Sequence, residues 1–378
     1  MALTKYKLGS LLELLDERNS DLKYGIDDVK GISIQKVFIE TKADMAGVSL
    51  KPYILVKPDS FAYVTVTSRN GEKITIAHND TENTYIVSSS YVVFRVSRPD
   101  LLLSDFLFMI FNRPEFDRYA RFNSWGSARE TFSWEEMCDI DIDLPPLSVQ
   151  QKYVDIYNSM LANQRCYERG LEDLRIVFEG YLDNLRRTES LKVIKPYIAL
   201  VEIKNDELEY GLDSVRGVSI EKKFIDTKAD ITNVNLKPYY VVKPNEFAYV
   251  TVTSRNGEKI SLALNDSNES IICSSSYVVF RSIDEKKLLP QYLMLYFSRS
   301  EFNRYARFNS WGSARETFSF EDMCDVEIPI PDISVQKAIA DIFTAYNTRK
   351  QINERLKAQI KDLCPILVRS AIQEGERN

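Results

Sequence analysis

The sequence of 378 residues contains a single histidine, His78, and the equivalent position of an internal repeat is Leu264. A catalytic or metal-binding histidine in both copies of the repeat is therefore excluded, and no serine–histidine–aspartate site is indicated. His78 is interpreted as a strand-end residue. The thirteen glycines form neither a GxGxxG nor a GxxxxGK[ST] pattern, so the loops that bind nucleotide phosphates are not predicted.

Cysteine and long apolar runs are also scarce. Five scattered cysteines include no CxxC pair, so they are expected to be small buried hydrophobes rather than disulfides or zinc ligands. No apolar run approaches the roughly 20 residues of a membrane helix, and the first residues lack a signal-peptide pattern. A cytoplasmic protein without a membrane is expected. The segment "DLPPLS" lacks the acid or amide and the aromatic of an amino-methyltransferase tetrapeptide, so no enzyme is predicted.

The strongest feature that is present is a duplication. Tyr24 matches Tyr210 and Trp125 matches Trp311, with a constant offset of 186 residues. Residues 118–133, "RYARFNSWGSARETFS", return unchanged at 304–319. The stretch "FAYVTVTSRNGEKI" is likewise identical at 61–74 and 247–260. A period of this length indicates a duplicated domain rather than a solenoid.

Each globular copy is predicted to be α+β. Alternating apolar residues around Asn70-Gly71 predict strands at 61–67 and 72–78, joined by a turn at Ser68–Gly71. A buried helix is expected at 101–112, and Pro114 suits the first turn of a second helix. Ser133 with Glu136 has the spacing of a capping box.

Each copy continues into a long amphipathic segment. Apolar residues recur at three- and four-residue steps from Val149 to Leu185, with Ser148 as the expected cap and Asn163 in the polar slot. The second segment begins near Val335, and Pro365 is expected to kink or end it near Leu363. Packing the two helices antiparallel as a coiled-coil-like rod with a pseudo-twofold axis would cover both seams. The alternative is that each helix folds back on its own domain.

These patterns divide the chain into four segments. The expected domains are a first globular domain at 1–146, a first helix at 147–187, a second globular domain at 188–332 and a second helix at 333–378.

The junction between domain and helix resembles a known family. "LPPLSVQQKYVDIY" at 144–157, "IPIPDISVQKAIADIF" at 328–343 and the "GSARETFS" lead-ins are similar to the specificity (S) subunit of Type I restriction–modification systems. The second copy has Asp332 where the motif has a second proline. The resemblance extends over essentially the whole chain.

The resemblance implies a DNA-associated bacterial or archaeal protein that is not itself catalytic. Each domain would be a target-recognition domain reading one half of a split site in double-stranded DNA. The helices would dock two modification (M) subunits, which carry S-adenosylmethionine and methylate adenine, and restriction (R) subunits that use ATP and Mg²⁺ would join them. No cofactor is expected in this chain. Identical heads predict a nearly palindromic, interrupted site.

A two-headed interaction scaffold without a DNA role is the alternative function. The formal net charge of −6 and the pI near 5.3 favour it slightly, because nucleic-acid binding usually needs a basic face.

Two segments hold the candidate DNA contacts, because arginine can pair with guanine and asparagine with adenine. Both segments also have a purely structural alternative. Trp125 could pack in the core, Asn70 could only form the turn, and Arg118 could pair with Glu115 along the helix. The loop around Trp125 could instead hold the domain onto the helix junction. The loop candidates are Arg121, Asn123, Trp125, Ser127 and Arg129, with mates Arg307, Asn309, Trp311, Ser313 and Arg315; the hairpin candidates are Ser68, Arg69 and Asn70, with mates Ser254, Arg255 and Asn256.

Overall fold

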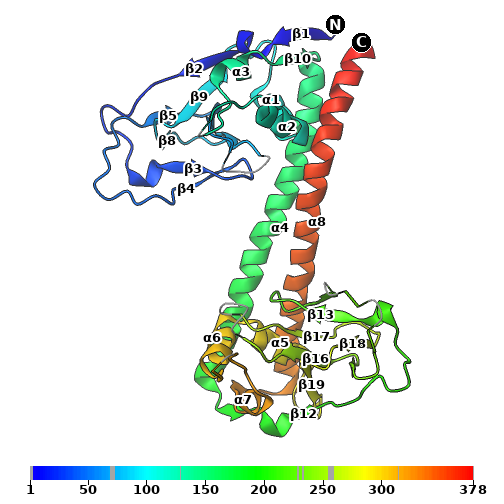
Figure 1. Cartoon of the computed structure of the whole chain (residues 1–378). Coiled ribbons are helices and arrows are strands. Elements are labelled where there is room, and N and C mark those ends of the chain that lie inside the picture. The colour runs from blue at the N-terminus through cyan, green and yellow to red at the C-terminus, as the bar shows by residue number, and fades with distance from the viewer. Residues whose placement is uncertain are drawn as a thin grey trace. The chain divides into compact units, whose positions relative to one another are not determined.

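The computed structural model describes residues 3–68, 73–127, 129–227, 230–231, 234–253, 259–313 and 315–377. The chain forms two compact units, each containing parts of both long helices (Figure 1). Unit 1 combines residues 1–167 with 352–378, and unit 2 comprises residues 168–351. Unit 1 therefore includes the C-terminal part of the chain, whereas unit 2 is one continuous stretch of it.

Unit 1 is built on a four-stranded antiparallel sheet. Its strand order is β2 (Leu12–Leu15), β9 (Tyr91–Val96), β6 (Ser60–Val64) and β7 (Ile76–His78). Three two-stranded ribbons accompany the sheet: β1 (Thr4–Lys7) with β10 (Asp141–Leu144), β3 (Lys30–Ile32) with β4 (Phe38–Glu40), and β5 (Ile54–Val56) with β8 (Tyr85–Val87). All of these pairs are antiparallel.

Three short helices and the 3₁₀ turns η1 (Leu8–Ser10) and η2 (Ile26–Asp28) complete the globular part of unit 1. The helix α1 (Ser104–Phe111) is buried, as its apolar sequence predicted, and contributes Phe106, Leu107 and Phe111 to the core. The next helix, α2 (Pro114–Phe122), has proline in its first turn, as predicted. The last, α3 (Trp134–Cys138), is capped by the Ser133 side chain, which accepts a hydrogen bond from the Glu136 N–H.

Unit 2 repeats this plan element by element. Its sheet has the order β12 (Ile198–Leu200), β19 (Tyr277–Ser282), β16 (Glu246–Val250) and β17 (Leu262–Leu264). The ribbons are β11 (Leu191–Val193) with β20 (Glu327–Pro329), β13 (Arg216–Val218) with β14 (Phe224–Asp226), and β15 (Tyr240–Val242) with β18 (Ile271–Cys273). The helical elements are η3 (Lys195–Tyr197), η4 (Leu212–Ser214), α5 (Pro290–Ser298), α6 (Ser300–Phe308) and α7 (Phe320–Cys324).

The long helices α4 (Leu147–Thr188) and α8 (Ile333–Arg377) pack against each other within each unit. In unit 1, Lys152 of α4 contacts Glu374 of α8 at 2.7 Å, and Gln164 donates to the Asn353 side chain at 2.9 Å. In unit 2, Phe178 of α4 packs edge-on against Phe343 of α8. In unit 1 the contact residue on α8 moves back along the chain, from Glu374 to Asn353, as the contact residue on α4 advances from Lys152 to Gln164, so the helices are antiparallel. The expected mixed fold with paired long helices is confirmed.

The helix halves belong to the cores of the globular parts. Val154 and Tyr157 of α4 join the unit 1 core together with Ile360 and Val368 of α8. In unit 2 the core contains Phe178 and Leu182 of α4, together with Ile339, Ala340 and Phe343 of α8. The seams predicted from the sequence are therefore covered both by the partner helix and by the globular domain.

Several local predictions are corrected by the structure. The strands expected at 61–67 and 72–78 are shorter, because the backbone at Thr65 and Thr67 bonds to residues 130–132 instead of continuing the ladder. The helix α4 begins at Leu147, so Ser148 lies inside it and is not the cap. The buried polar position is Gln164, whereas Asn163 is exposed.

Pro365 does not end the second long helix, which continues to Arg377. Proline removes one helical N–H, but Cys364, Val368 and Ala371 on either side of it are buried in the unit 1 core. Tertiary packing on this face therefore carries the helix through the proline.

The glutamine of each junction motif fixes the start of the long helix. The fully buried Gln150 side chain donates to the carbonyls of Leu101 and Pro145, both at 2.8 Å, and accepts from the Leu103 N–H at 3.0 Å. Gln336 makes the three equivalent bonds in unit 2, to Lys287, Pro331 and Leu289. One glutamine side chain thus ties the start of each long helix to the segment that precedes α1 or α5.

Within the described residues, no helix is long and apolar enough to cross a membrane. The same residues contain no group of three or more metal-ligating side chains.

Candidate nucleic-acid interface

The candidate interface is built around the segment that follows α2 in unit 1 and α6 in unit 2. We call residues 123–131 and 309–317 the NSWGSARET loop, of which Ala128 and Ala314 lie outside the described part. The helix ends at Asn123, whose side chain donates to the Tyr119 carbonyl at 3.0 Å. Asn309 caps α6 in the same way, at 2.9 Å to Tyr305. Asn123 and Asn309 therefore have a structural role as helix caps.

A glycine makes the loop possible. Gly126 has a φ angle of +137° and Gly312 has one of +139°. Residues other than glycine rarely adopt this backbone conformation. A Cβ at Gly126 would lie 2.3 Å from the Arg129 carbonyl oxygen, and the same distance separates a Cβ at Gly312 from the Arg315 oxygen. The bend brings Trp125 opposite Thr131, where the two backbones exchange hydrogen bonds of 3.1 and 2.9 Å.

The structure places the loop beside the base of the hairpin between β6 and β7. The Thr67 N–H donates to the Glu130 carbonyl at 3.0 Å, and the Phe132 N–H donates to the Thr65 carbonyl at 2.8 Å. The buried Thr67 hydroxyl also donates to the Ser124 hydroxyl at 2.9 Å. In unit 2, Thr253 with Glu316 and Phe318 with Thr251 make the same backbone bonds. Both candidate segments thus start from one hydrogen-bonded platform in each unit.

The hairpin candidates themselves fall largely outside the described residues. Arg69 and Asn70 in the first copy, and Ser254, Arg255 and Asn256 in the second, lie there. Ser68 is described and is exposed.

The arginine candidate at the end of α2, and its mate at the end of α6, each form an ion pair with a glutamate. Arg121 forms an ion pair with Glu130, and Arg307 forms one with Glu316. Both arginine side chains remain about a third exposed, at 37 % and 36 %. The Arg118 side chain pairs with Glu115 at 3.6 Å, as the helical spacing predicted.

The remaining loop candidates are free to meet a partner. Trp125 is 63 % exposed and Trp311 is 66 % exposed, so the alternative that they pack in the core is wrong. Ser127, Arg129, Ser313 and Arg315 are also exposed. Neither Arg129 nor Arg315 has an ion pair within the described residues. The described loop bonds reach the hairpin base and the preceding helix, and none reaches the long helices, which does not support the clasp alternative.

One exposed aromatic residue in each unit was not predicted from the sequence. Phe122 and Phe308, the last residues of α2 and α6, are each 79 % exposed. The helical pattern carried the signal, because Phe116 and Ala120 mark the buried face of α2 and a residue six positions after Phe116 points away from that face. Phe122, Trp125 and Arg129 are thus all exposed at the end of α2 or in the loop that follows it.

One tyrosine near the end of each of these helices, Tyr119 in α2 and Tyr305 in α6, is anchored in the core. Tyr119 packs edge-on against the buried Phe132, with ring centroids 6.3 Å apart, and Tyr305 packs in the same way on Phe318 at 6.2 Å. Burial raises the pKa of both tyrosines, so their hydroxyls remain protonated at neutral pH. These contacts fasten the ends of α2 and α6, where Phe122 and Phe308 are exposed, to the core.

Part of the chain matches the model of a known family. Residues 189–362 match the model of the Type I restriction modification DNA specificity domain. No curated protein sequence matches the chain.

Solved structures resemble the whole chain. The S subunit of a Type I restriction–modification system from M. genitalium is similar with a TM-score of 0.58 and 9 % identity, covering 99 % of this chain and 96 % of that one. An HsdS subunit from Thermoanaerobacter tengcongensis is 14 % identical over 98 % of this chain and 96 % of that one, with a TM-score of 0.38. The resemblance to Type I specificity subunits predicted from the sequence is confirmed, and the first of these neighbours shows the shared fold.

Proposed function

From the Type I restriction–modification specificity domain that this chain carries, we propose that it is the DNA-reading subunit of such a system. Each unit contacts one half of a split site in double-stranded DNA. The chain itself performs no catalysis and docks modification and restriction subunits. The observation that carries the proposal is the exposed Trp125 and Arg129 pair, displayed again as Trp311 and Arg315 in unit 2.

These side chains have the chemistry that base reading requires. An arginine fork can pair with two acceptors of guanine in the major groove, and serine can donate to a base or a phosphate. An exposed aromatic ring can contact a thymine methyl group or pack on a sugar or base. The NSWGSARET loop displays all three on a hydrogen-bonded platform, which limits the conformational entropy lost on binding.

The same residues support a nearly palindromic site. Exposed side chains are not required to be identical for packing, yet Phe122, Trp125, Ser127 and Arg129 all return unchanged in the second copy. Two identical surfaces reading inverted halves of a duplex would recognise the same bases twice. Half-site spacing in DNA mirrors the geometry of the protein that reads it.

Because this chain is acidic, partner subunits would have to supply part of the contact with DNA phosphates. Phosphate contacts contribute much of the affinity for DNA, whereas base contacts contribute the specificity. With a net charge of −6, this chain would rely on two modification subunits for part of the phosphate contact. S-adenosylmethionine on those subunits, and ATP with Mg²⁺ on restriction subunits, would supply the chemistry of methylation and cleavage.

A binding experiment separates this proposal from a scaffold without a DNA role. The full chain is co-expressed with an N6-adenine methyltransferase subunit and titrated with duplex DNA containing or lacking the methylated site. We expect co-purification and specific binding at least about 10³-fold tighter than nonspecific binding, with a steep loss of affinity as salt rises. Co-purification without any preference among duplexes would support the scaffold instead.

A further inference from the structure

Unit 1 contains a buried lysine that is neutralised by its own carboxylate. The Lys36 side chain, 5 % exposed, lies 2.7 Å from the Asp117 carboxylate of α2. The same carboxylate accepts a hydrogen bond from the Ile74 N–H at 3.2 Å. Lys36 also donates to the Phe111 carbonyl. The positive charge is therefore matched by one anionic group that joins a loop, a helix and a strand end.

Unit 2 retains the lysine but lacks the carboxylate. Lys222 is the repeat mate of Lys36, and Asn303 replaces Asp117 in an otherwise nearly identical helix. The Lys222 ammonium donates to the Ile260 carbonyl at 3.2 Å and lies 5.4 Å from the centre of the Phe302 ring. Within the described residues it has no ion pair, and the Asn303 Oδ1 atom is buried without a hydrogen-bond partner.

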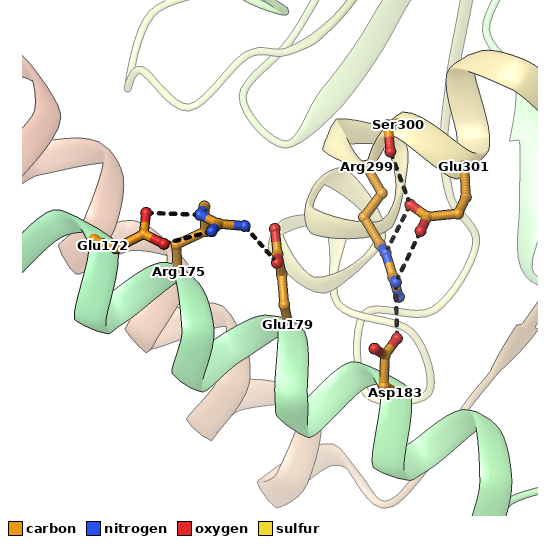
Figure 2. A network of polar contacts seen from close by, with 7 residues as sticks. All are labelled: Glu172, Arg175, Glu179, Asp183, Arg299, Ser300 and Glu301. Carbon is orange, nitrogen blue, oxygen red and sulfur yellow. Dashed lines mark hydrogen bonds and ion pairs between the residues drawn. The ribbon is translucent and has the colours of Figure 1, made fainter. Parts of the chain in front are cut away.

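A cavity of about 470 Å³ opens beside these two residues in unit 2. Most of the other cations that line it are already paired, as Figure 2 shows for two arginines. Arg175 bonds Glu172 and Glu179, and Arg299 bonds Asp183 and Glu301. Lys259 pairs with Glu221 at 3.0 Å. Among the described lining residues, Lys222 and Lys350 are the cations left without an ion pair.

We propose that unit 2 binds a small oxyanion in this cavity, at the place that the Asp117 carboxylate occupies in unit 1. The anion would pair with the Lys222 ammonium. It would also accept from the Ile260 N–H, the mate of the Ile74 N–H that Asp117 bonds in unit 1. A half-turn of the Asn303 amide presents its NH₂ group, which can donate to the same anion. Unit 1 carries its counter-ion covalently, whereas unit 2 takes one from solution.

The electrostatics of the two units support this assignment. A partly buried charge without an opposite charge beside it is costly, because one carbonyl and one ring replace only part of the lost water. Burial, together with the nearby Lys259, lowers the pKa of Lys222 to about 7. An oxyanion beside the ammonium would relieve this cost as Asp117 does for Lys36. The chemistry fits inorganic phosphate or a phosphate of the DNA backbone, and the experiment distinguishes these sources.

The test is isothermal titration of the full chain with inorganic phosphate at pH 6, where the Lys222 amine is protonated. We expect saturable binding at one site. Asn303→Asp should restore the internal ion pair and weaken phosphate binding at least about tenfold, the effect of losing one hydrogen bond to a charged group. Lys222→Met, which removes the charge without burying a new polar group, should weaken binding to the same degree.

The outcomes are separable. Absence of saturable phosphate binding, or equal affinity in the wild type and both variants, would overturn the proposal. If the variants also lower the salt slope of duplex DNA binding by about one, the anion is a backbone phosphate. An unchanged slope with lost phosphate binding assigns the site to a free oxyanion. Thermal unfolding of each variant checks that unit 2 remains folded.

Discussion

Replacing Arg129 and Arg315 together by alanine is expected to weaken site-specific DNA binding and methylation strongly while leaving assembly intact. Both side chains are exposed and lack an ion pair within the described residues, so their loss removes no internal contact found there. A two-pronged arginine–guanine pair contributes about 1–3 kcal/mol of discrimination. Loss of one such pair in each half-site would weaken specific binding by roughly 30-fold or more, because the free-energy costs at well-separated positions are additive.

A matched control removes the same charge elsewhere. Arg95 and Arg281 are repeat mates on β9 and β19, both are exposed, and Arg95 pairs with Glu13 at 2.8 Å. The double change Arg95→Ala and Arg281→Ala should leave specificity unchanged. Competition titration with specific and nonspecific duplexes measures the difference. If the Arg129 and Arg315 variant fails to co-purify with the methyltransferase subunit, the loop holds the complex together rather than reading DNA.

Replacing Gln150 by leucine is expected to destabilise unit 1 by about 3 kcal/mol or more. Leucine has a similar size but leaves the Leu103 N–H and the Leu101 and Pro145 carbonyls without their partner. Each buried polar group left unsatisfied costs about 1–3 kcal/mol. Because two of the three groups lie on the segment 101–103, the start of α4 would lose its fixed position on the domain.

The neighbouring glutamine supplies the control for this prediction. Gln151 is exposed and bonds only Asp155 among the described residues, so Gln151→Ala should change the free energy of unfolding by less than about 0.5 kcal/mol. Gln336→Leu should produce the same loss in unit 2 as Gln150→Leu does in unit 1. Urea unfolding followed by circular dichroism measures each change. A Gln150→Leu protein as stable as the wild type would contradict this role.

The repeat made the fold predictable from the sequence. Two copies at a constant offset specify equivalent elements, and the apolar steps after Pro146 and Pro331 specify two long helices. Local patterns were weaker guides, since Pro365 lies inside α8 and Ser148 inside α4. In both places packing against the core outweighs the local sequence pattern. Such packing involves distant segments, so it cannot be predicted from one segment alone.

The candidate site was predictable in composition but not in detail. The identical stretch drew attention to Arg121, Asn123, Trp125 and Arg129, yet the sequence could not distinguish them. The structure shows Arg121 paired with Glu130 and Asn123 capping a helix, which leaves Trp125 and Arg129 exposed. The difference between Asp117 and Asn303 is visible in the sequence, but its partners Lys36 and Lys222 lie about 80 residues away in each copy.

The central claim is that the two units recognise the same bases. Sequencing of methylated adenines in DNA from cells that express this chain with its modification subunit tests it most directly. We expect one interrupted motif whose two halves are reverse complements, or nearly so, because the exposed loop residues are the same in both units. Two unrelated half-sites flanking the spacer would contradict it.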